Sequence, residues 1–450
     1  HKAFSAIFDA NVTTLLIALI LGYFGSGPVR GFATTLGIGV FTSFLTALYL
    51  SRVIIEALVS GKDEREISFK STFSRALFKN PNFDFIGKRK IAYAFSIGIL
   101  VVGFGVMFMQ GGPLLGVDFK GGRSYVVEFA NAVPASEARE AVLPGFQSAG
   151  TEAKTYGGDR RLKITTSYLS DDESTAGDKK VEEALMSGLN AKFASAKPTI
   201  LSTAKVGATM ADDIKQSAVV SLLVALAGIF LYVMLRFGGR WEFSFGAVVS
   251  LFHDALFLLA GFAIARLFGL NYEMDQVFIA AVLTVVGFSM NDTVVIYDRL
   301  REYLKENPRL TFAQIANPAL NSTLSRTLIT STTIFLVVLV LFIFGGETLR
   351  SFSFAMLIGV AFGTYSSIFI ASAIIYDTIS RTKSGAELMH TTATGEDGDE
   401  SGIPTLDRGL APVAQETSSG LMGAAGAMAN NPGSLGGRIP ANLPSNLPPQ

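Results

Sequence analysis

The sequence contains no cysteine, few charged residues and almost no histidine, and each shortage excludes a class of site or partner. Without cysteine the chain has no disulfide framework, no thiol nucleophile and no thiolate metal site. The three histidines, His1, His253 and His390, lie far apart in the chain, which argues against a zinc site. Lys+Arg and Asp+Glu both total 37, so the formal net charge is zero and we expect no nucleic-acid partner. No motif indicates a bound cofactor.

The sequence is rich in long runs of apolar residues. Hydrophobic residues make up 49% of the 450-residue chain and charged residues 16%, whereas a soluble domain carries about 25% charged residues. A helix needs about 20 mostly apolar residues to cross a bilayer. The sequence therefore predicts a polytopic α-helical membrane protein with about eight transmembrane helices, at roughly 5–24, 31–52, 91–110, 215–235, 243–266, 275–297, 323–344 and 352–377.

Basic residues occur in every second connection between these runs, within 62–90, 236–240, 299–309 and 381–383. The positive-inside rule makes this side cytoplasmic. The opposite side then receives the connections at 25–30, 111–210, 267–274 and 345–350.

The long outer connection has the pattern of a small α+β domain. Strand-like alternation at 124–129, 152–156, 162–168 and 199–206 is interrupted by helical stretches from Ala135 and at Lys179–Phe193. The order βαββαβ predicts a ferredoxin-like domain of about 85 residues. It has no acid pair with a base, no Gly-rich phosphate loop and no metal-ligand cluster, so we interpret it as a binding or lever domain without chemistry.

These connections divide the chain into six parts. After Lys383 the composition shifts to Gly, Pro, Ala, Ser and Asn, which predicts a disordered cytoplasmic tail. The predicted parts are two helices that end a first half (1–58), a cytoplasmic linker (59–90), the first helix of a second half (91–110), the outer domain (111–210), a five-helix bundle (211–380) and the tail (381–450).

The first two spans repeat in the last two at an offset of 320 residues. Gly25 aligns with Gly345, Phe32 with Phe352, and Ile38-Gly-Val40 with Ile358-Gly-Val360. Both pairs of spans start on the cytoplasmic side, so the repeat is parallel, about an axis along the membrane normal. If the second copy ends a six-span unit, the first ends another whose beginning is absent. Together with the lack of a signal peptide, this leads us to expect the C-terminal piece of a longer polypeptide.

Two ionisable residues approach similar depths from opposite sides of the membrane. Asp292 lies about four turns into its span from the outside, and Arg326 about one turn into the next span from the cytoplasm. A charge near the middle of a membrane helix costs about 2.5–3.5 kcal/mol, so each of them requires a physical reason. We interpret them as an acid–base pair for proton transfer; alternatively, each is an interfacial anchor whose side chain reaches toward the cytoplasm.

Three further ionisable residues leave alternatives open. The repeat places Arg326 over Ala6, so Asp9 lies about one turn further along the same face; it is a relay carboxylate or a first-turn acid favoured by the helix dipole. His253 and Asp254 lie in the middle of the fifth span, either as a neutral hydrogen-bonded interior pair or as a further proton carrier.

These motifs, in this order, resemble the SecD/SecF accessory subunits of the bacterial protein-export machinery, relatives of the resistance-nodulation-division transporters. Residues 1–60 resemble the end of SecD, with Phe8-Asp-Ala-Asn-Val-Thr-Thr14, and residues 84–380 resemble a complete SecF. The SecF motifs include Gly116-Val-Asp-Phe-Lys-Gly-Gly122, whose Asp118, Lys120, Gly121 and Gly122 form a structural signature, His253-Asp254, Asn291–Arg299 and Ser325-Arg-Thr327.

The resemblance implies a multi-pass protein of the bacterial inner membrane, with its outer domain in the periplasm. It implies no enzymatic activity but use of the proton-motive force to promote export of unfolded proteins, together with the SecYEG channel and with SecA and YidC. Asp292 and Arg326 match the SecF relay residues. The main SecD relay acid lies one span before Asp9 in the family pattern and is therefore missing, so we expect this chain not to work alone.

Two other functions are possible on the same residues. A proton-coupled exporter of a small molecule or lipid would use a similar relay but would need a roomy apolar pocket and a larger outer region. A structural scaffold for the channel complex would not depend on Asp292 at all.

Overall fold

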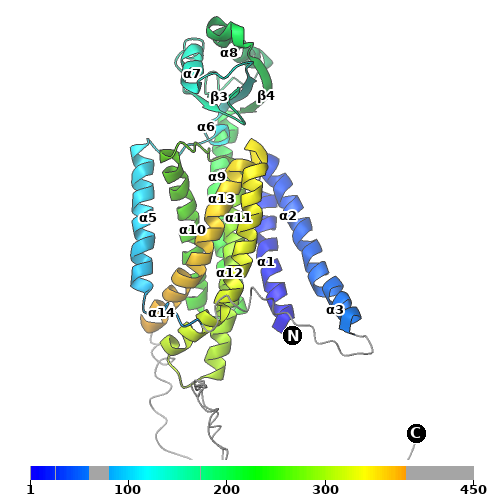
Figure 1. The fold of residues 1–450 in the computed structure, drawn as a ribbon, viewed down its shortest axis with the longest axis vertical. Coiled ribbons are helices and arrows are strands. Elements are labelled where there is room, and N and C mark those ends of the chain that lie inside the picture. Colours follow the sequence, from blue (N-terminus) through cyan, green and yellow to red (C-terminus); the bar gives the residue numbers. More distant parts are fainter. Residues whose placement is uncertain (1, 26, 60–80, 173, 382–450) are drawn as a thin grey trace, which may run out of the picture. The chain divides into compact units, whose positions relative to one another are not determined.

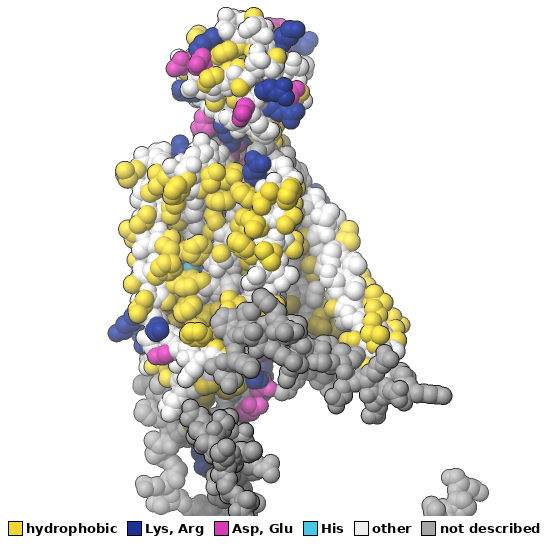
Figure 2. All heavy atoms as spheres, viewed as in Figure 1, with side chains coloured by type: hydrophobic (Ala, Val, Ile, Leu, Met, Phe, Trp, Pro, Cys, Tyr) yellow, Lys and Arg dark blue, Asp and Glu magenta, His cyan; other side chains and the backbone are white. Residues whose placement is uncertain are grey.

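The computed structural model describes residues 2–25, 27–59, 81–172 and 174–381. The predicted tail and most of the predicted linker lie outside the described residues. Within these ranges eight helical spans are long and apolar enough to cross a membrane, in agreement with the eight predicted ones. Figure 1 shows them running side by side, and Figure 2 shows hydrophobic side chains covering the visible face of this helical bundle.

Six of the eight spans are continuous or nearly continuous α-helices, and two are interrupted. The continuous ones are α1 (Lys2–Phe24), α5 (Arg89–Met109), α9 (Ala208–Arg236), α10 (Trp241–Leu267), α11 (Gln276–Glu306) and α12 (Phe312–Phe344). The interrupted ones are α2–η1–α3 (Gly27–Leu45, Thr46–Leu50 and Ser51–Val59) and α13–η3–α14 (Gly346–Ser366, Ser367–Ala371 and Ser372–Arg381).

The interruptions support the internal repeat. Both η1 and η3 are π-helical turns, and they begin 321 residues apart, within one residue of the predicted offset. The rings of Phe32 and Phe352, which the repeat aligns, contact each other with centroids 5.5 Å apart. Two equivalent residues meet in this way only near the axis that relates the two copies.

Helix α12 starts 11 residues before its predicted span because its first turns are polar. Thr311 and Gln314 form a capping box in which each side chain bonds the other residue's backbone N–H, and this fixes the helix start. The apolar run alone did not include these turns. As a result Arg326 lies near the middle of a helix, although the apolar run begins only one turn before it.

The α+β domain has the predicted ferredoxin-like order. Its elements are β1 (Gly122–Glu128), α7 (Ala135–Val142), β2 (Thr151–Thr155), β3 (Arg161–Thr166), α8 (Thr175–Phe193), η2 (Ala194–Ala196) and β4 (Thr199–Val206). The sheet order is β2-β3-β1-β4, all neighbours being antiparallel. As predicted, α8 packs one apolar face on the sheet, and Val181, Leu185 and Leu189 are fully buried.

Helix α11 is the centre of the membrane bundle. It packs against α1, α2, α9, α10, α12, α13 and η3, and most of its apolar window is buried. The short helix α6 (Val117–Lys120) joins the α+β domain to the bundle (Figure 1). We call the end of the bundle next to this domain the domain end, and the opposite end, which carries Arg236, Arg299, Arg301 and Arg381, the basic end.

Close packing of α13 on α11 depends on Gly359. A Cβ atom at this position would lie 2.1 Å from a methyl group of Val285. Overpacking of this kind costs about 1–3 kcal/mol, so we expect Gly359→Ala to lower the thermal stability of the protein in detergent, followed by circular dichroism.

The repeat offers a matched control for this substitution. Gly39 is equivalent to Gly359, but a Cβ atom there would meet nothing within 4 Å. Gly39→Ala should leave stability unchanged or raise it by up to about 1 kcal/mol through helix propensity. Equal melting temperatures for the two variants would contradict the assigned packing.

Candidate functional site

The carboxylate of Asp292 lies inside the bundle, among hydroxyl groups from two neighbouring helices. Its side chain on α11 is 5% exposed. Ser331 of α12 donates a hydrogen bond to Asp292 Oδ2 at 3.2 Å, and Thr364 of α13 donates to Ser331 at 2.7 Å. This short chain of hydroxyl groups connects the acid to both helices that pack on that side of α11.

Arg326 lies on α12, near Asp292 but not bonded to it. No hydrogen bond or ion pair joins the two side chains in the described part of the chain, although the charge of Arg326 still acts on Asp292. Arg326 is exposed and lines a cavity of about 770 Å³ at the basic end. Asn291, next to Asp292 on α11, also lines this cavity.

Asp9 is paired with an arginine, and this arginine is not Arg326. Asp9 on α1 is 3% exposed. Its carboxylate accepts hydrogen bonds from Arg236 of α9, with N–O distances of 2.7–2.9 Å, and from the Tyr232 hydroxyl at 2.7 Å. Arg236 also bonds Asp298 of α11 at 3.1 Å. These four residues, which we call the Asp9 cluster, join three helices at the basic end.

His253 and Asp254 on α10 form a hydrogen-bonded pair inside the bundle. Asp254 Oδ1 lies 3.1 Å from His253 Nδ1. Asp254 Oδ2 accepts bonds from Ser289 of α11 at 2.6 Å and Ser366 of α13 at 2.8 Å. His253 Nε2 lies 3.0 Å from the Ser96 hydroxyl of α5. Four helices thus meet at one polar cluster.

The Gly116–Gly122 motif connects the α+β domain to the start of α11. Asp118 Oδ2 accepts a hydrogen bond at 3.0 Å from the backbone N–H of Gln276, the first residue of α11. Lys120 bonds Glu152 of β2 at 2.7 Å. Gly121 and Gly122 have φ angles of 72° and 117°, a conformation that favours glycine, and a Cβ at Gly122 would also lie 2.3 Å from a backbone oxygen.

A buried acid beside this motif binds two lysines of the domain. Glu273, which is 6% exposed, pairs with Lys154 of β2 at 2.7 Å and Lys163 of β3 at 2.8 Å. Burial alone would raise the pKa of Glu273, but the two ammonium groups outweigh it and hold that pKa below its usual value. Only two residues separate Glu273 from the first residue of α11, so the ion pairs connect the sheet directly to the start of this helix.

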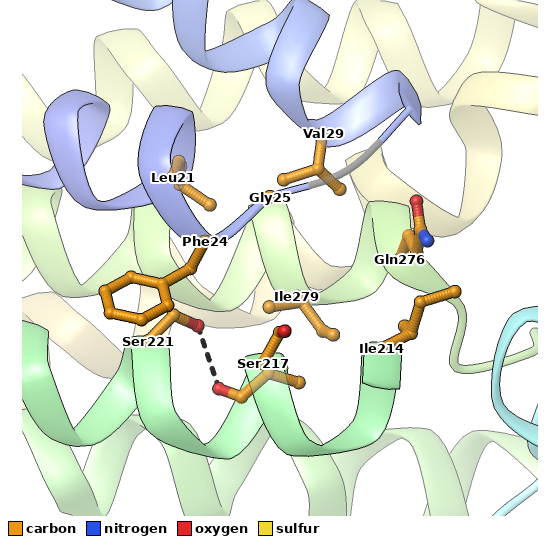
Figure 3. A pocket seen from close by; sticks show the side chains of 10 residues that line it. Leu21, Phe24, Gly25, Val29, Ile214, Ser217, Ser221, Gln276 and Ile279 are labelled. Carbon is orange, nitrogen blue, oxygen red and sulfur yellow. Dashed lines mark hydrogen bonds between the residues drawn. The ribbon is translucent and has the colours of Figure 1, made fainter. Parts of the chain in front are cut away.

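A small cavity lies near the domain end between α1, α9 and α11. It has a volume of about 30 Å³, enough for a water molecule. Figure 3 shows Ser217, Ser221 and Gln276 among its lining residues. The Ser221 hydroxyl donates its hydrogen bond to the backbone carbonyl of Ala218. Ile17, Leu283 and Val286, which belong to the hydrophobic core of the bundle, are fully or almost fully buried.

Several residues of these clusters were not found from sequence. The sequence indicates Arg236 only as a basic residue of a cytoplasmic connection, and Ser331, Thr364 and Glu273 belong to no recognised motif. A signal existed for Arg236, because it ends an apolar run at the depth of Asp9. Among the described residues no three His, Asp or Glu side chains gather in a metal-binding arrangement.

The structure defines a class of protein: a polytopic helical membrane protein with ionisable residues inside the bundle and one ferredoxin-like domain at one end. The family profile described as "Protein export membrane protein SecD/SecF, C-terminal" matches residues 187–381. A protein translocase subunit SecF of Rhodothermus marinus is 42% identical over 309 residues, which are 68% of this chain and 96% of that protein. The chain belongs to the SecD/SecF family.

Longer relatives extend the match to the first two helices. A protein translocase subunit SecDF of Bacillus subtilis is 32% identical over 399 residues, or 83% of this chain and 50% of that protein. The crystal structure of SecDF from Thermus thermophilus, titled a translocon-associated membrane protein, superimposes with a TM-score of 0.71 at 31% identity, over 84% of this chain and 48% of that one. The chain thus spans nearly all of the SecF relative and about half of the SecDF relatives.

The Asp9 cluster predicts a strong energetic coupling between Asp9 and Arg236. Arg236→Gln leaves the buried Asp9 carboxylate without its main counter-charge, which should cost about 3 kcal/mol of stability. Asp9→Asn should cost less, because Arg236 keeps Asp298. In the double variant no charge remains buried alone, so it should be more stable than Arg236→Gln. Thermal unfolding of the three variants and the unchanged protein completes the double-mutant cycle. Stability losses that simply add in the double variant would contradict the pairing.

The connection between domain and bundle should tighten in mild acid. Burial raises the pKa of Asp275, the N-cap of α11, to about 6, above its unfolded value of 3.8. The folded form therefore binds more protons between these two values, so stability rises as pH falls from 7 to 5. Glu273, with its lowered pKa, stays ionised over this range. Hydrogen exchange of residues 267–278, corrected for the intrinsic rate, should slow about fivefold, and Asp275→Asn should abolish this change.

Proposed function

We propose that this chain is part of an accessory subunit of the Sec protein translocase, which uses the proton-motive force to promote export of unfolded proteins. The observation that carries the proposal is the position of Asp292. It is buried in the membrane bundle on α11, the same helix whose first turn is bonded to the α+β domain. Uptake of a proton at Asp292 can therefore act on a helix that contacts the outer domain.

The surroundings of Asp292 support proton exchange with the basic end. The 770 Å³ cavity brings solvent to Arg326 and Asn291, one residue from the acid. Toward the domain end, α11 is packed among buried apolar side chains, and the cavity between α1, α9 and α11 there has a volume of only about 30 Å³. This asymmetry matches one state of an alternating-access cycle, in which the acid communicates with one side at a time.

The hydroxyl chain provides the mechanical response. When Asp292 is ionised, it accepts the Ser331 hydrogen bond and attracts Arg326. Protonation removes that attraction, so the packing of α12 and α13 on α11 changes. One charge that moves through 100 mV supplies about 2.3 kcal/mol, which biases a two-state element by roughly fifty-fold.

The rest of the proposal follows the family. We place the protein in the bacterial inner membrane, with the basic end in the cytoplasm and the α+β domain in the periplasm, where it makes weak, sequence-tolerant contact with unfolded chains. The partners are the SecYEG channel, with SecA and YidC. This chain matches only about half the length of the SecDF relatives, so the proposed working unit includes residues beyond this chain.

Replacing Asp292 with Asn in the complete protein tests the proposal. The substitution keeps the size of the side chain and a hydrogen-bond acceptor for Ser331 but removes the titratable proton. We expect the proton-dependent part of export into inverted membrane vesicles to be lost, while membrane assembly is unchanged. Asp298→Asn, on the same helix but in the Asp9 cluster, is the matched control and should retain most of the proton-dependent export.

Normal proton-dependent export by Asp292→Asn would refute the role of Asp292 and favour a structural scaffold. An exporter of a small molecule or lipid would lose transport in this variant, while export of proteins would be unaffected in cells. The same substitution thus separates all three functions.

A further inference from the structure

The hydroxyl groups around His253 and Asp254 fix where the hydrogens of this cluster lie. The Tyr365 hydroxyl has one hydrogen, and it is donated to the backbone carbonyl of Ala92 at 2.8 Å, because a carbonyl only accepts. Ser96 and Tyr365 also lie 3.1 Å apart, so Ser96 must donate to Tyr365. Ser96 then has no hydrogen left for His253. The bond of 3.0 Å between them requires a hydrogen on His253 Nε2.

The other side of the imidazole faces a carboxylate that already accepts two bonds. Ser289 donates to Asp254 Oδ2 at 2.6 Å, and Ser366 shares its hydrogen between Asp254 Oδ2 at 2.8 Å and the Gly363 carbonyl at 3.1 Å. The contact between Asp254 Oδ1 and His253 Nδ1 at 3.1 Å needs one hydrogen of its own. With the second hydrogen on Nε2, the pair is either an imidazolium beside a carboxylate or a neutral imidazole beside a carboxylic acid. In both cases the pair holds one shared proton and has no net charge.

The ring environment favours the imidazolium form. The His253 ring lies 4.2 Å from the Phe257 ring centroid and 6.3 Å from that of Tyr365. Aromatic faces attract cations, and the adjacent carboxylate does so more strongly. An imidazole is also the side chain whose unperturbed pKa lies nearest neutrality, so it exchanges protons readily in this range.

Helix α13 connects this pair to Asp292. Thr364 bonds Ser331, which bonds Asp292, and Ser366 bonds Asp254. Directly after Ser366, α13 changes into the π-helical turn η3, whose first residue, Ser367, lies 2.9 Å from the Thr293 hydroxyl, next to Asp292 on α11. Such turns often occur at functional sites. A movement of α13 that follows a change at one acid therefore moves hydroxyl groups bonded to the other.

We infer that His253 and Asp254 form a second proton-binding centre, which holds one shared proton in this conformation and whose protonation is coupled to that of Asp292 through the hydroxyl groups of α13. The coupling rests on the proposed titration of Asp292, whereas the shared proton does not. The elements packed against α10 carry these ionisable side chains in the described chain: Arg89, Lys90 and Tyr93 on α5; Asp212, Asp213, Lys215, Tyr232 and Arg236 on α9; Asp292, Tyr297, Asp298, Arg299, Arg301, Glu302, Tyr303, Lys305 and Glu306 on α11; Arg350 and Tyr365 on α13; and Tyr376, Asp377 and Arg381 on α14.

Nitrogen NMR of the full chain in lipid bilayers tests this inference, because the sequence contains only three histidines. With His1→Gln and His390→Gln, ¹⁵N-histidine labels His253 alone. We expect its ring nitrogens to carry two hydrogens, one of them shared with Asp254, at neutral pH. A ring that carries a single hydrogen, with none shared with Asp254, would overturn the centre.

The coupling is tested by adding Asp292→Asn. Loss of a nearby negative charge makes proton loss from the pair easier, so the midpoint of the His253 titration should fall by about one pH unit, a tenfold change in proton affinity. Asp298→Asn, the matched control, should leave the midpoint in place. An unchanged midpoint in Asp292→Asn would overturn the coupling, and it would not bear on export, which the vesicle assay measures separately.

Discussion

Charges inside a lipid-facing bundle must be neutralised or hydrogen-bonded by the protein itself, and this constraint organises the molecule around α11. The helix carries Asp292 near its middle and Asp298 toward the basic end, and its first turn is bonded by Asp118. Each of these carboxylates has partners on other helices or loops. Because a single charge near mid-membrane costs about 2.5–3.5 kcal/mol, the helices that supply those partners cannot move far without an energetic penalty.

The same constraint makes α11 suited to transmit movement. Asp292 lies 16 positions after Gln276, which is bonded to the domain motif, so the helix spans about 24 Å between the two. Helices are stiff over this length, and the Glu273 pairs join the sheet to the loop at its start. A change in packing at Asp292 is therefore carried to the α+β domain by one rigid element rather than by a series of loops.

Sequence patterns located the elements well because their signals are local. The apolar runs, the alternation of 124–129 and the helical spacing of Val181, Leu185 and Leu189 each depend on neighbours within a few turns. The identity of the residue that pairs with a buried charge does not depend on such neighbours in the sequence. The repeat places Asp9 one turn from the position equivalent to Arg326 but predicts no partner for it, and the structure pairs it with Arg236 of α9. Similarly, Arg326 matched Asp292 in depth, and only the packing of α12 shows its side chain in the cavity rather than in an ion pair.

The two copies of the repeat share a feature of the backbone but differ in the polar side chains around it. Both copies contain the π-helical turn, but only the turn at Ser367–Ala371 has buried hydroxyl partners in the described chain; the side chains of Thr46–Leu50 are half-buried or exposed. A π turn interrupts the regular backbone hydrogen bonds of an α-helix. Its presence in both copies therefore indicates that both helices need the same change of backbone geometry at this point. In the second copy the π turn lies where α13 packs on α10 and α11. By the rotation that relates the copies, the surface of α2 and η1 is the one on which an equivalent pair of helices would pack.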